Sequence, residues 1–222
     1  MIPLRALIRI RSFPAVTLGL IIVNSLCFLF KLALSSYGEQ ALIYKYALIP
    51  SRVHLTSLVT SMFLHGSLMH LIGNMWFLWV FGSRVEDTLG SAKYLAYYLL
   101  CGVAAALVHL ALNFGSPIPT IGASGAIAGV MGGFMLLYPR ARILTLIFIV
   151  IFITTLEVPA VILLLYWFAI QVFSGLFSFN HLSMTDAGGV AWFAHVGGFL
   201  AGMVFLSLFG GPARRSTYEY RY

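Results

Sequence analysis

Charged residues are scarce in this chain, and their scarcity excludes a water-soluble globular protein. Asp, Glu, Lys and Arg make up 9% of the 222 residues, whereas soluble domains carry about 25%. Apolar residues make up 61%, and they recur in runs of the length that crosses a bilayer, about 20 residues. The composition therefore predicts a membrane protein with several spans.

Cysteines and acidic residues are also few. The two cysteines, Cys27 and Cys101, lie inside apolar runs, so neither a disulfide framework nor a cysteine metal site is indicated. Six acidic residues against 13 basic ones leave a net charge of +7. In a membrane protein such an excess is typical of basic loops that face anionic lipid, so we expect a lipid bilayer and no nucleic acid as partner.

Six apolar segments predict an all-α polytopic membrane protein, built as a bundle of six transmembrane helices. No repeat, low-complexity tract or linker interrupts the chain, so we expect residues 1–222 to form a single membrane domain. No small-residue cleavage site clearly follows the first basic residues, which indicates an uncleaved first helix. The predicted spans are Pro14–Leu34, Leu58–Gly82, Ala92–Leu112, Ser124–Tyr138, Pro159–Phe179 and Ala194–Gly210.

The distribution of Lys and Arg predicts that both termini are cytoplasmic. In this orientation only Lys31, Lys45 and Arg52 of the 13 basic residues lie on the outer side. The apolar stretch Ile143–Leu156 is too short for an ordinary span, so we interpret it as an interfacial or partly buried connector on the cytoplasmic side. If it crossed the membrane, the last helix would begin on the face opposite Ser124.

The segment Ile121–Gly129 holds a serine between glycines, a setting that leaves the Ser124 hydroxyl accessible at a tight turn into a helix. Pro117 and Pro119 prevent regular helix just before it. A helix from Ser124 to Tyr138 is about 22 Å long, which is shorter than the hydrocarbon core of about 30 Å. Ser124 is therefore expected below the outer surface, where free N–H groups of the helix N-terminus could stabilise an oxyanion.

A second interpretation of this segment is structural. Gly125, Gly129 and Gly133 lie four residues apart, the spacing of a small-residue face that packs against another helix. His195 favours chemistry, because it opens a second glycine-rich helix predicted to start from the same face. A serine and a histidine brought together in this way form a nucleophile and its general base.

His70 and Asn74 lie four residues apart on one face of the second predicted helix. Their side chains could donate to an oxyanion, and the alternative is a helix–helix hydrogen bond or a bound water. His65 and His109 are interpreted as structural, the latter mid-span without an evident partner. All six acidic residues fall in loops or at span ends, with Asp186 nearest to the last helix, so a Ser-His dyad is favoured over a triad.

A set of motifs gives the sequence a family resemblance. They are His70-x-x-x-Asn74, Gly122-Ala-Ser124-Gly125, Ala194-His195-x-Gly-Gly, Phe81-Gly-Ser-Arg-Val-Glu86, and Pro159-Ala followed by Trp167-Phe and Gln171. Over roughly residues 56–210 the chain resembles the rhomboid family of intramembrane serine proteases.

The resemblance implies a serine endopeptidase that cleaves transmembrane segments of other membrane proteins and needs no metal or cofactor. It implies Ser124 as nucleophile, His195 as base, and an oxyanion hole made by His70, Asn74 and the backbone N–H of Ser124. Some members carry an aromatic residue four positions after the serine, which stacks on the histidine; this chain has Ala128 there.

The resemblance also implies a substrate gate formed by Trp167, Phe168 and Gln171, and a location in the inner (plasma) membrane of a bacterium. Two other functions stay open at this point. One is a non-catalytic rhomboid-like protein that only binds membrane helices, although the chain retains both members of the dyad. The other is a haem- or ion-handling membrane protein that uses His70 and His195, with His109, as ligands or proton relays.

Overall fold

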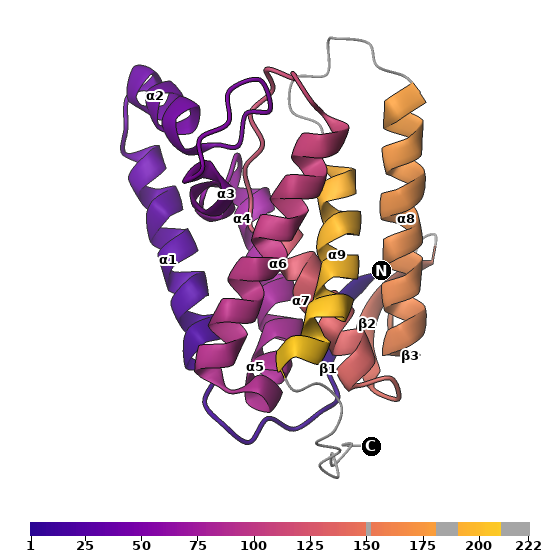
Figure 1. The fold of residues 1–222 in the computed structure, drawn as a ribbon. Coiled ribbons are helices and arrows are strands. Elements are labelled where there is room, and N and C mark those ends of the chain that lie inside the picture. The colour runs from indigo at the N-terminus through magenta and orange to yellow at the C-terminus, as the bar shows by residue number, and fades with distance from the viewer. Residues whose placement is uncertain (150–151, 181–190, 210–222) are drawn as a thin grey trace.

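The computed structural model describes residues 1–149, 152–180 and 191–209. Within them the chain is mostly helical, with a three-stranded sheet beside the helices (Figure 1). The α-helices are α1 (Ala15–Leu32), α2 (Ser36–Tyr46), α3 (Ser57–Thr60), α4 (Leu68–Phe77), α5 (Ser83–Leu89), α6 (Ser91–Leu112), α7 (Ser124–Leu137), α8 (Ala160–Asn180) and α9 (Trp192–Leu206). The other elements are η1 (Ser61–Phe63), η2 (Leu78–Gly82), η3 (Ser207–Phe209), β1 (Ile2–Ala6), β2 (Arg142–Ile149) and β3 (Phe152–Pro159).

Four helices in the described part of the chain are long and apolar enough to cross a membrane. They are α1, α6, α8 up to Phe177, and α9 together with η3. Helix α7 is apolar but shorter, and the second predicted span is divided into several helical pieces. The chain is thus a multi-pass membrane protein, and the count of six spans stays a prediction.

The predicted single helix over Leu58–Gly82 was wrong in its boundaries. The chain leaves the helical conformation after η1, and Ser67 restarts it as the N-cap of α4, where its hydroxyl accepts a hydrogen bond from the N–H of His70 at 3.2 Å. A serine in this position satisfies one of the free N–H groups of the first turn. From Leu68 the helix then continues through a π-helical segment, η2, into α5 and ends at Leu89.

The predicted all-α fold is confirmed as mostly helical, but the sheet was not predicted: strands β1, β2 and β3 form an antiparallel sheet in that order. The described residues of the stretch Ile143–Leu156 belong to strands β2 and β3, and the many isoleucines and threonines of this stretch favour strand over helix. Strands β2 and β3 run in opposite directions, so the end of β3 lies beside the start of β2. There the N–H of Ala160 donates to the carbonyl oxygen of Ala141 at 2.8 Å. Helix α8 therefore begins beside the end of α7.

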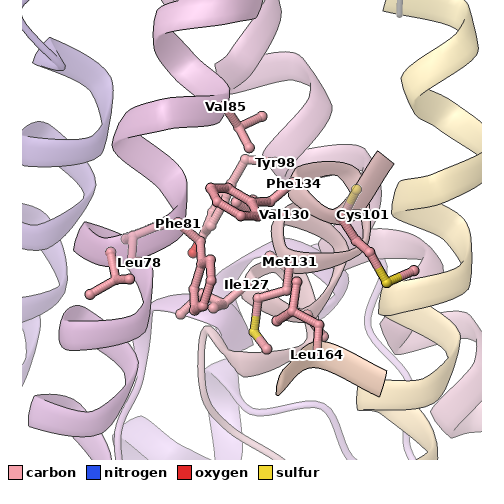
Figure 2. Close-up of a cluster of buried hydrophobic side chains, with 14 of the residues drawn as sticks. Leu78, Phe81, Val85, Tyr98, Cys101, Ile127, Val130, Met131, Phe134 and Leu164 are labelled. Atoms are coloured by element: carbon pink, nitrogen blue, oxygen red, sulfur yellow. The ribbon is translucent and has the colours of Figure 1, made fainter. Parts of the chain in front are cut away.

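Helix α7 lies at the centre of the packed core, and nearly all of its side chains are buried. Figure 2 shows the apolar cluster around it, to which η2, α5, α6 and α8 contribute. Its labelled members are Leu78, Phe81, Val85, Tyr98, Cys101, Ile127, Val130, Met131, Phe134 and Leu164. Because close packing resists displacement, the start of α7 is held by the body of the protein.

Glycines allow the backbones of α7 and α9 to touch. A Cβ on Gly198 would overlap the carbonyl oxygen of Gly125, and a Cβ on Gly202 would overlap that of Gly129. The hydroxyl of Tyr97, from α6, lies 2.8 Å from the carbonyl oxygens of both Gly129 and Gly202. The glycine spacing thus packs one helix against the other, as small-residue faces do in membranes.

Two acidic residues hold the start of α1. The buried carboxylate of Glu86 accepts hydrogen bonds from the N–H groups of Val16 at 2.8 Å and Thr17 at 2.7 Å. The carboxylate of Asp87 accepts from the N–H of Ser12 at 2.7 Å. Negative charge at a helix N-terminus compensates its free N–H groups, so these acids fix α1 against α5.

Candidate active site

Ser124 is the first residue of α7, and the chain before it is held by the loop that follows α2. Leu48 and Thr120 pair as an antiparallel bridge, with N···O distances of 2.8 and 3.0 Å. Gly122 has a φ of 133°, and a Cβ there would lie 2.8 Å from ring atoms of His70. Both the backbone angle and the close ring require glycine at this position, and together they define where α7 begins.

The structure brings Ser124 and His195 together from separate helices. The Nε2 atom of His195, in the first turn of α9, lies 2.7 Å from the Oγ atom of Ser124. The contact between Gly125 and Gly198 permits this approach, because Gly125 follows Ser124 directly and Gly198 lies three residues after His195. His195 is buried and Ser124 is half-buried, so the pair faces a restricted space.

Gln171 lies at the other side of the imidazole. Its Oε1 atom is 2.7 Å from Nδ1 of His195, and its side chain is 4% exposed. The family resemblance predicts Gln171 as part of a substrate gate, and no motif in the sequence indicates that it contacts the histidine. The available signal is a lone amide in an otherwise apolar span, because polar residues in spans are usually functional.

The other two predicted gate residues, Trp167 and Phe168, lie on the same face of α8 as Gln171. The Trp167 ring lies 5.8 Å from the imidazole of His195, tilted by 34°. Phe168 packs on Phe199 of α9, with ring centroids 4.9 Å apart. An aromatic ring therefore covers the histidine even though residue 128 is alanine, and it comes from α8.

His70 and Asn74 lie on α4 and line the same cavity as Ser124 and His195, with a volume of about 740 Å³. The Nδ2 atom of Asn74 is buried and has no hydrogen-bond partner among the described residues. It lies 3.7 Å from where a Cβ on Gly122 would stand, beside the chain that leads into Ser124. A buried amide donor without a partner is costly, and in this position it can serve a ligand in the cavity.

His109 differs from its prediction, because it has partners. It lies in the last turn of α6, where its Nε2 atom is 2.8 Å from Oγ1 of Thr120 and its Nδ1 atom 3.3 Å from the Nδ2 atom of Asn113. His65 is fully buried and packs edge-on against His70, 5.1 Å between ring centroids. In the described ranges no three His, Cys, Asp or Glu side chains converge as metal ligands do. Asp186 and residues 210–222, with their predicted inner arginines, lie outside those ranges.

Comparison with known proteins points in one direction. The sequence profile of the rhomboid domain matches residues 52–211 of the chain. Rhomboid protein 1, mitochondrial, of Saccharomyces cerevisiae is 35% identical over 96 residues, which are 41% of this chain and 28% of that protein. The human Presenilin-associated rhomboid-like protein, mitochondrial, is 36% identical over 104 residues, 46% of this chain and 27% of that protein.

A bacterial relative is also similar. Rhomboid protease GluP of Bacillus subtilis is 37% identical over 78 residues, which are 35% of this chain and 15% of that protein. The aligned segments cover about a quarter of the length of the mitochondrial relatives and less of the bacterial one. The similarity therefore concerns only a part of these longer relatives.

Proposed function

The chain belongs to the rhomboid family, and we propose that it is an intramembrane serine endopeptidase that cleaves transmembrane segments of other membrane proteins. The observation that carries the proposal is the distance of 2.7 Å between Oγ of Ser124 and Nε2 of His195. A hydroxyl within hydrogen-bond reach of an imidazole is the arrangement that activates a serine nucleophile.

In the proposed reaction the Oγ atom of Ser124 attacks a substrate carbonyl carbon while Nε2 of His195 takes the hydroxyl proton. The negative charge that develops on the carbonyl oxygen is stabilised by the Asn74 amide, by His70 and by the N–H of Ser124 at the helix N-terminus. His195 then gives the proton to the leaving amine, and the C–N bond breaks. A water molecule, deprotonated by His195, hydrolyses the acyl ester and returns Ser124.

The membrane setting follows from the same residues. The cavity that holds the dyad supplies polar groups, which a bilayer interior lacks, so water and an unwound peptide can meet there. We propose that the substrate segment approaches along α8, past Trp167 and Phe168. We further propose that the dyad opens to the outer face of a bacterial plasma membrane, with both termini in the cytoplasm, because Lys and Arg concentrate on that side.

A fluorophosphonate probe tests this function, since it reacts only with an activated serine. We expect labelling of the folded protein in detergent, and its loss in Ser124→Ala and in His195→Ala. Ser207→Ala, on the exposed turn after α9, is the matched control and should label normally. Absence of labelling in folded wild type would overturn the protease and leave a protein that binds membrane helices.

The oxyanion hole has its own test. Asn74→Leu should lower kcat on a model transmembrane substrate by about 10²–10³-fold, the usual cost of one such donor. Since the Nδ2 atom of Asn74 has no partner among the described residues, its removal should not destabilise the fold. A variant with unchanged kcat would remove Asn74 from the mechanism.

A further inference from the structure

We propose that Gln171 is a positioning residue of the Ser124–His195 pair: its amide oxygen holds the imidazole in the one tautomer that can accept the serine proton. This inference rests on the proposed function and adds a third side chain to a site that the sequence describes as a dyad. Gln171 then orients His195 and does not only line the path of the substrate.

The orientation of the Gln171 amide is fixed by a backbone contact. Its Nε2 atom lies 3.2 Å from the carbonyl oxygen of Trp167, one turn earlier in α8. Only the NH₂ half of an amide can donate to a carbonyl. The oxygen half must therefore face Nδ1 of His195, at the observed 2.7 Å.

The amide orientation in turn determines the tautomer of His195. An amide oxygen can only accept, so the proton of the neutral imidazole must lie on Nδ1. This leaves Nε2 with its lone pair, 2.7 Å from Oγ of Ser124, where it accepts the hydroxyl proton. Without Gln171 the proton could lie on Nε2, and the histidine could not act as base towards Ser124.

Burial makes this contact decisive. Gln171 is 4% and His195 8% exposed, so water has little access to replace the amide. The imidazole also has Trp167 over one face and Trp192 at 6.4 Å, nearly perpendicular. Among the described residues no carboxylate contacts Nδ1, and the amide stands where triads place an acid.

A structural consequence follows from the helix that carries Gln171. Ser124 and His195 belong to α7 and α9, whereas Gln171 and Trp167 both belong to α8. A displacement of α8 away from α9 therefore breaks the contact with Nδ1 and at the same time removes the Trp167 ring from the imidazole, while Trp192 of α9 stays in place. The base is oriented only while α8 is in place against α9.

Three substitutions at this position test the proposal. Gln171→Met keeps the shape of the side chain and removes the strong acceptor, so we expect kcat to fall about 10–100-fold with KM unchanged, out of the 10²–10⁴-fold that a general base supplies. Gln171→Asn keeps the amide, but its side chain is one methylene too short to reach Nδ1, so kcat should fall by a similar factor. Gln171→Glu restores an acceptor of full length and should return kcat to within about threefold of wild type.

The direct readout is the protonation of the ring. ¹⁵N NMR of the detergent-solubilised protein, with His195 assigned by loss of its signals in His195→Ala, should show a proton on Nδ1 in wild type. Gln171→Met should shift the population towards Nε2–H. Phe173→Leu, on the exposed face of α8, is the control and should change neither kcat nor the ring signals.

The possible results separate this inference from the proposed function. A wild-type Nε2–H tautomer, or Gln171→Met and Gln171→Glu with equal kcat, would overturn the positioning role even if the protein is a protease. A wild-type protein that no fluorophosphonate labels would overturn the protease, while the NMR tautomer would still report on Gln171.

Discussion

Helices α7 and α8 both meet α9, but they do so in different ways. On the α7 side the contact is backbone against backbone, so that a Cβ on Gly198 or Gly202 would overlap a carbonyl oxygen of α7. On the α8 side the contact is made by side chains, chiefly Trp167, Phe168 and Gln171. Much of the remaining surface of α8 is apolar and exposed, in keeping with a helix that faces lipid.

The difference separates two requirements of the proposed chemistry. The glycine contact between α7 and α9 sets the distance between nucleophile and base, because two helices packed backbone against backbone cannot slide without losing contact. The orientation of the base and the access of substrate depend on α8, whose side-chain contacts can be made and broken. Substitutions on the two sides should therefore fail in different ways.

The largest effect is expected from Gly198→Ala. The added methyl group would overlap the carbonyl oxygen of Gly125 and push α9 away from α7, which separates His195 from Ser124. We expect fluorophosphonate labelling to fall at least about 100-fold, since each 1.36 kcal/mol of lost transition-state stabilisation is a factor of ten. Overpacking should also lower the free energy of unfolding by about 1–3 kcal/mol.

Gly19→Ala is the matched control for this change, because a Cβ at Gly19 in α1 meets nothing within 4 Å. It should label at the wild-type rate and unfold at the same or a slightly higher temperature, given the better helix propensity of alanine. Equal labelling of Gly198→Ala and Gly19→Ala would mean that the contact between α7 and α9 does not set the catalytic distance.

An intermediate effect is expected from Tyr97→Phe. The variant removes a buried hydroxyl that bonds the carbonyl oxygens of Gly129 and Gly202, one on each helix. Loss of this hydroxyl should cost about 0.5–1.5 kcal/mol of unfolding free energy, the net contribution of a typical hydrogen bond, because both carbonyl oxygens still accept hydrogen bonds within their own helices. Labelling should fall only a few-fold, since the glycine contacts remain, and thermal unfolding in detergent measures the difference. Unchanged unfolding would show that the hydroxyl does not join the two helices.

The contact between α7 and α9 could be anticipated from the sequence. Ser124 and His195 each open a glycine-rich helix, and a local pattern of this kind needs no knowledge of the rest of the chain. The family resemblance is confirmed by the rhomboid domain match over residues 52–211. The roles of the two residues stay predictions, although the structure holds them 2.7 Å apart.

The contact of Gln171 and Trp167, from α8, with His195 of α9 could not be anticipated from hydrophobic periodicity. Helix α8 carries apolar residues on every face, so hydrophobic periodicity does not define which face points inward. At about 100° per residue, a small error in the rotation of the helix turns Gln171 from the lipid towards His195. Strands β2 and β3 were missed for a related reason: hydrophobic periodicity alone does not distinguish a strand from a helix in a short apolar run, and the β-branched residues that favour strand were not weighed. The break before α4 depends on the Ser67 cap, which periodicity does not detect.

The smallest effect, and the one that probes α8 itself, is expected from Phe168→Ala. The variant removes the ring contact with Phe199 but leaves Trp167 and Gln171 against His195. Such an aromatic contact contributes about 1 kcal/mol, so outward positions of α8 should become about fivefold more populated.

If substrate enters beside α8, Phe168→Ala should raise kcat/KM for a transmembrane substrate by up to about that factor. Its labelling by a small fluorophosphonate should stay within about twofold of wild type, because the probe needs no helix displacement. Phe173→Ala, whose ring is 72% exposed, is the control for the loss of an aromatic side chain from α8. Parallel changes in probe labelling and substrate cleavage would place Phe168 in the support of the dyad and not in the path of the substrate. Helices α7 and α8 would then move with α9 as one rigid unit.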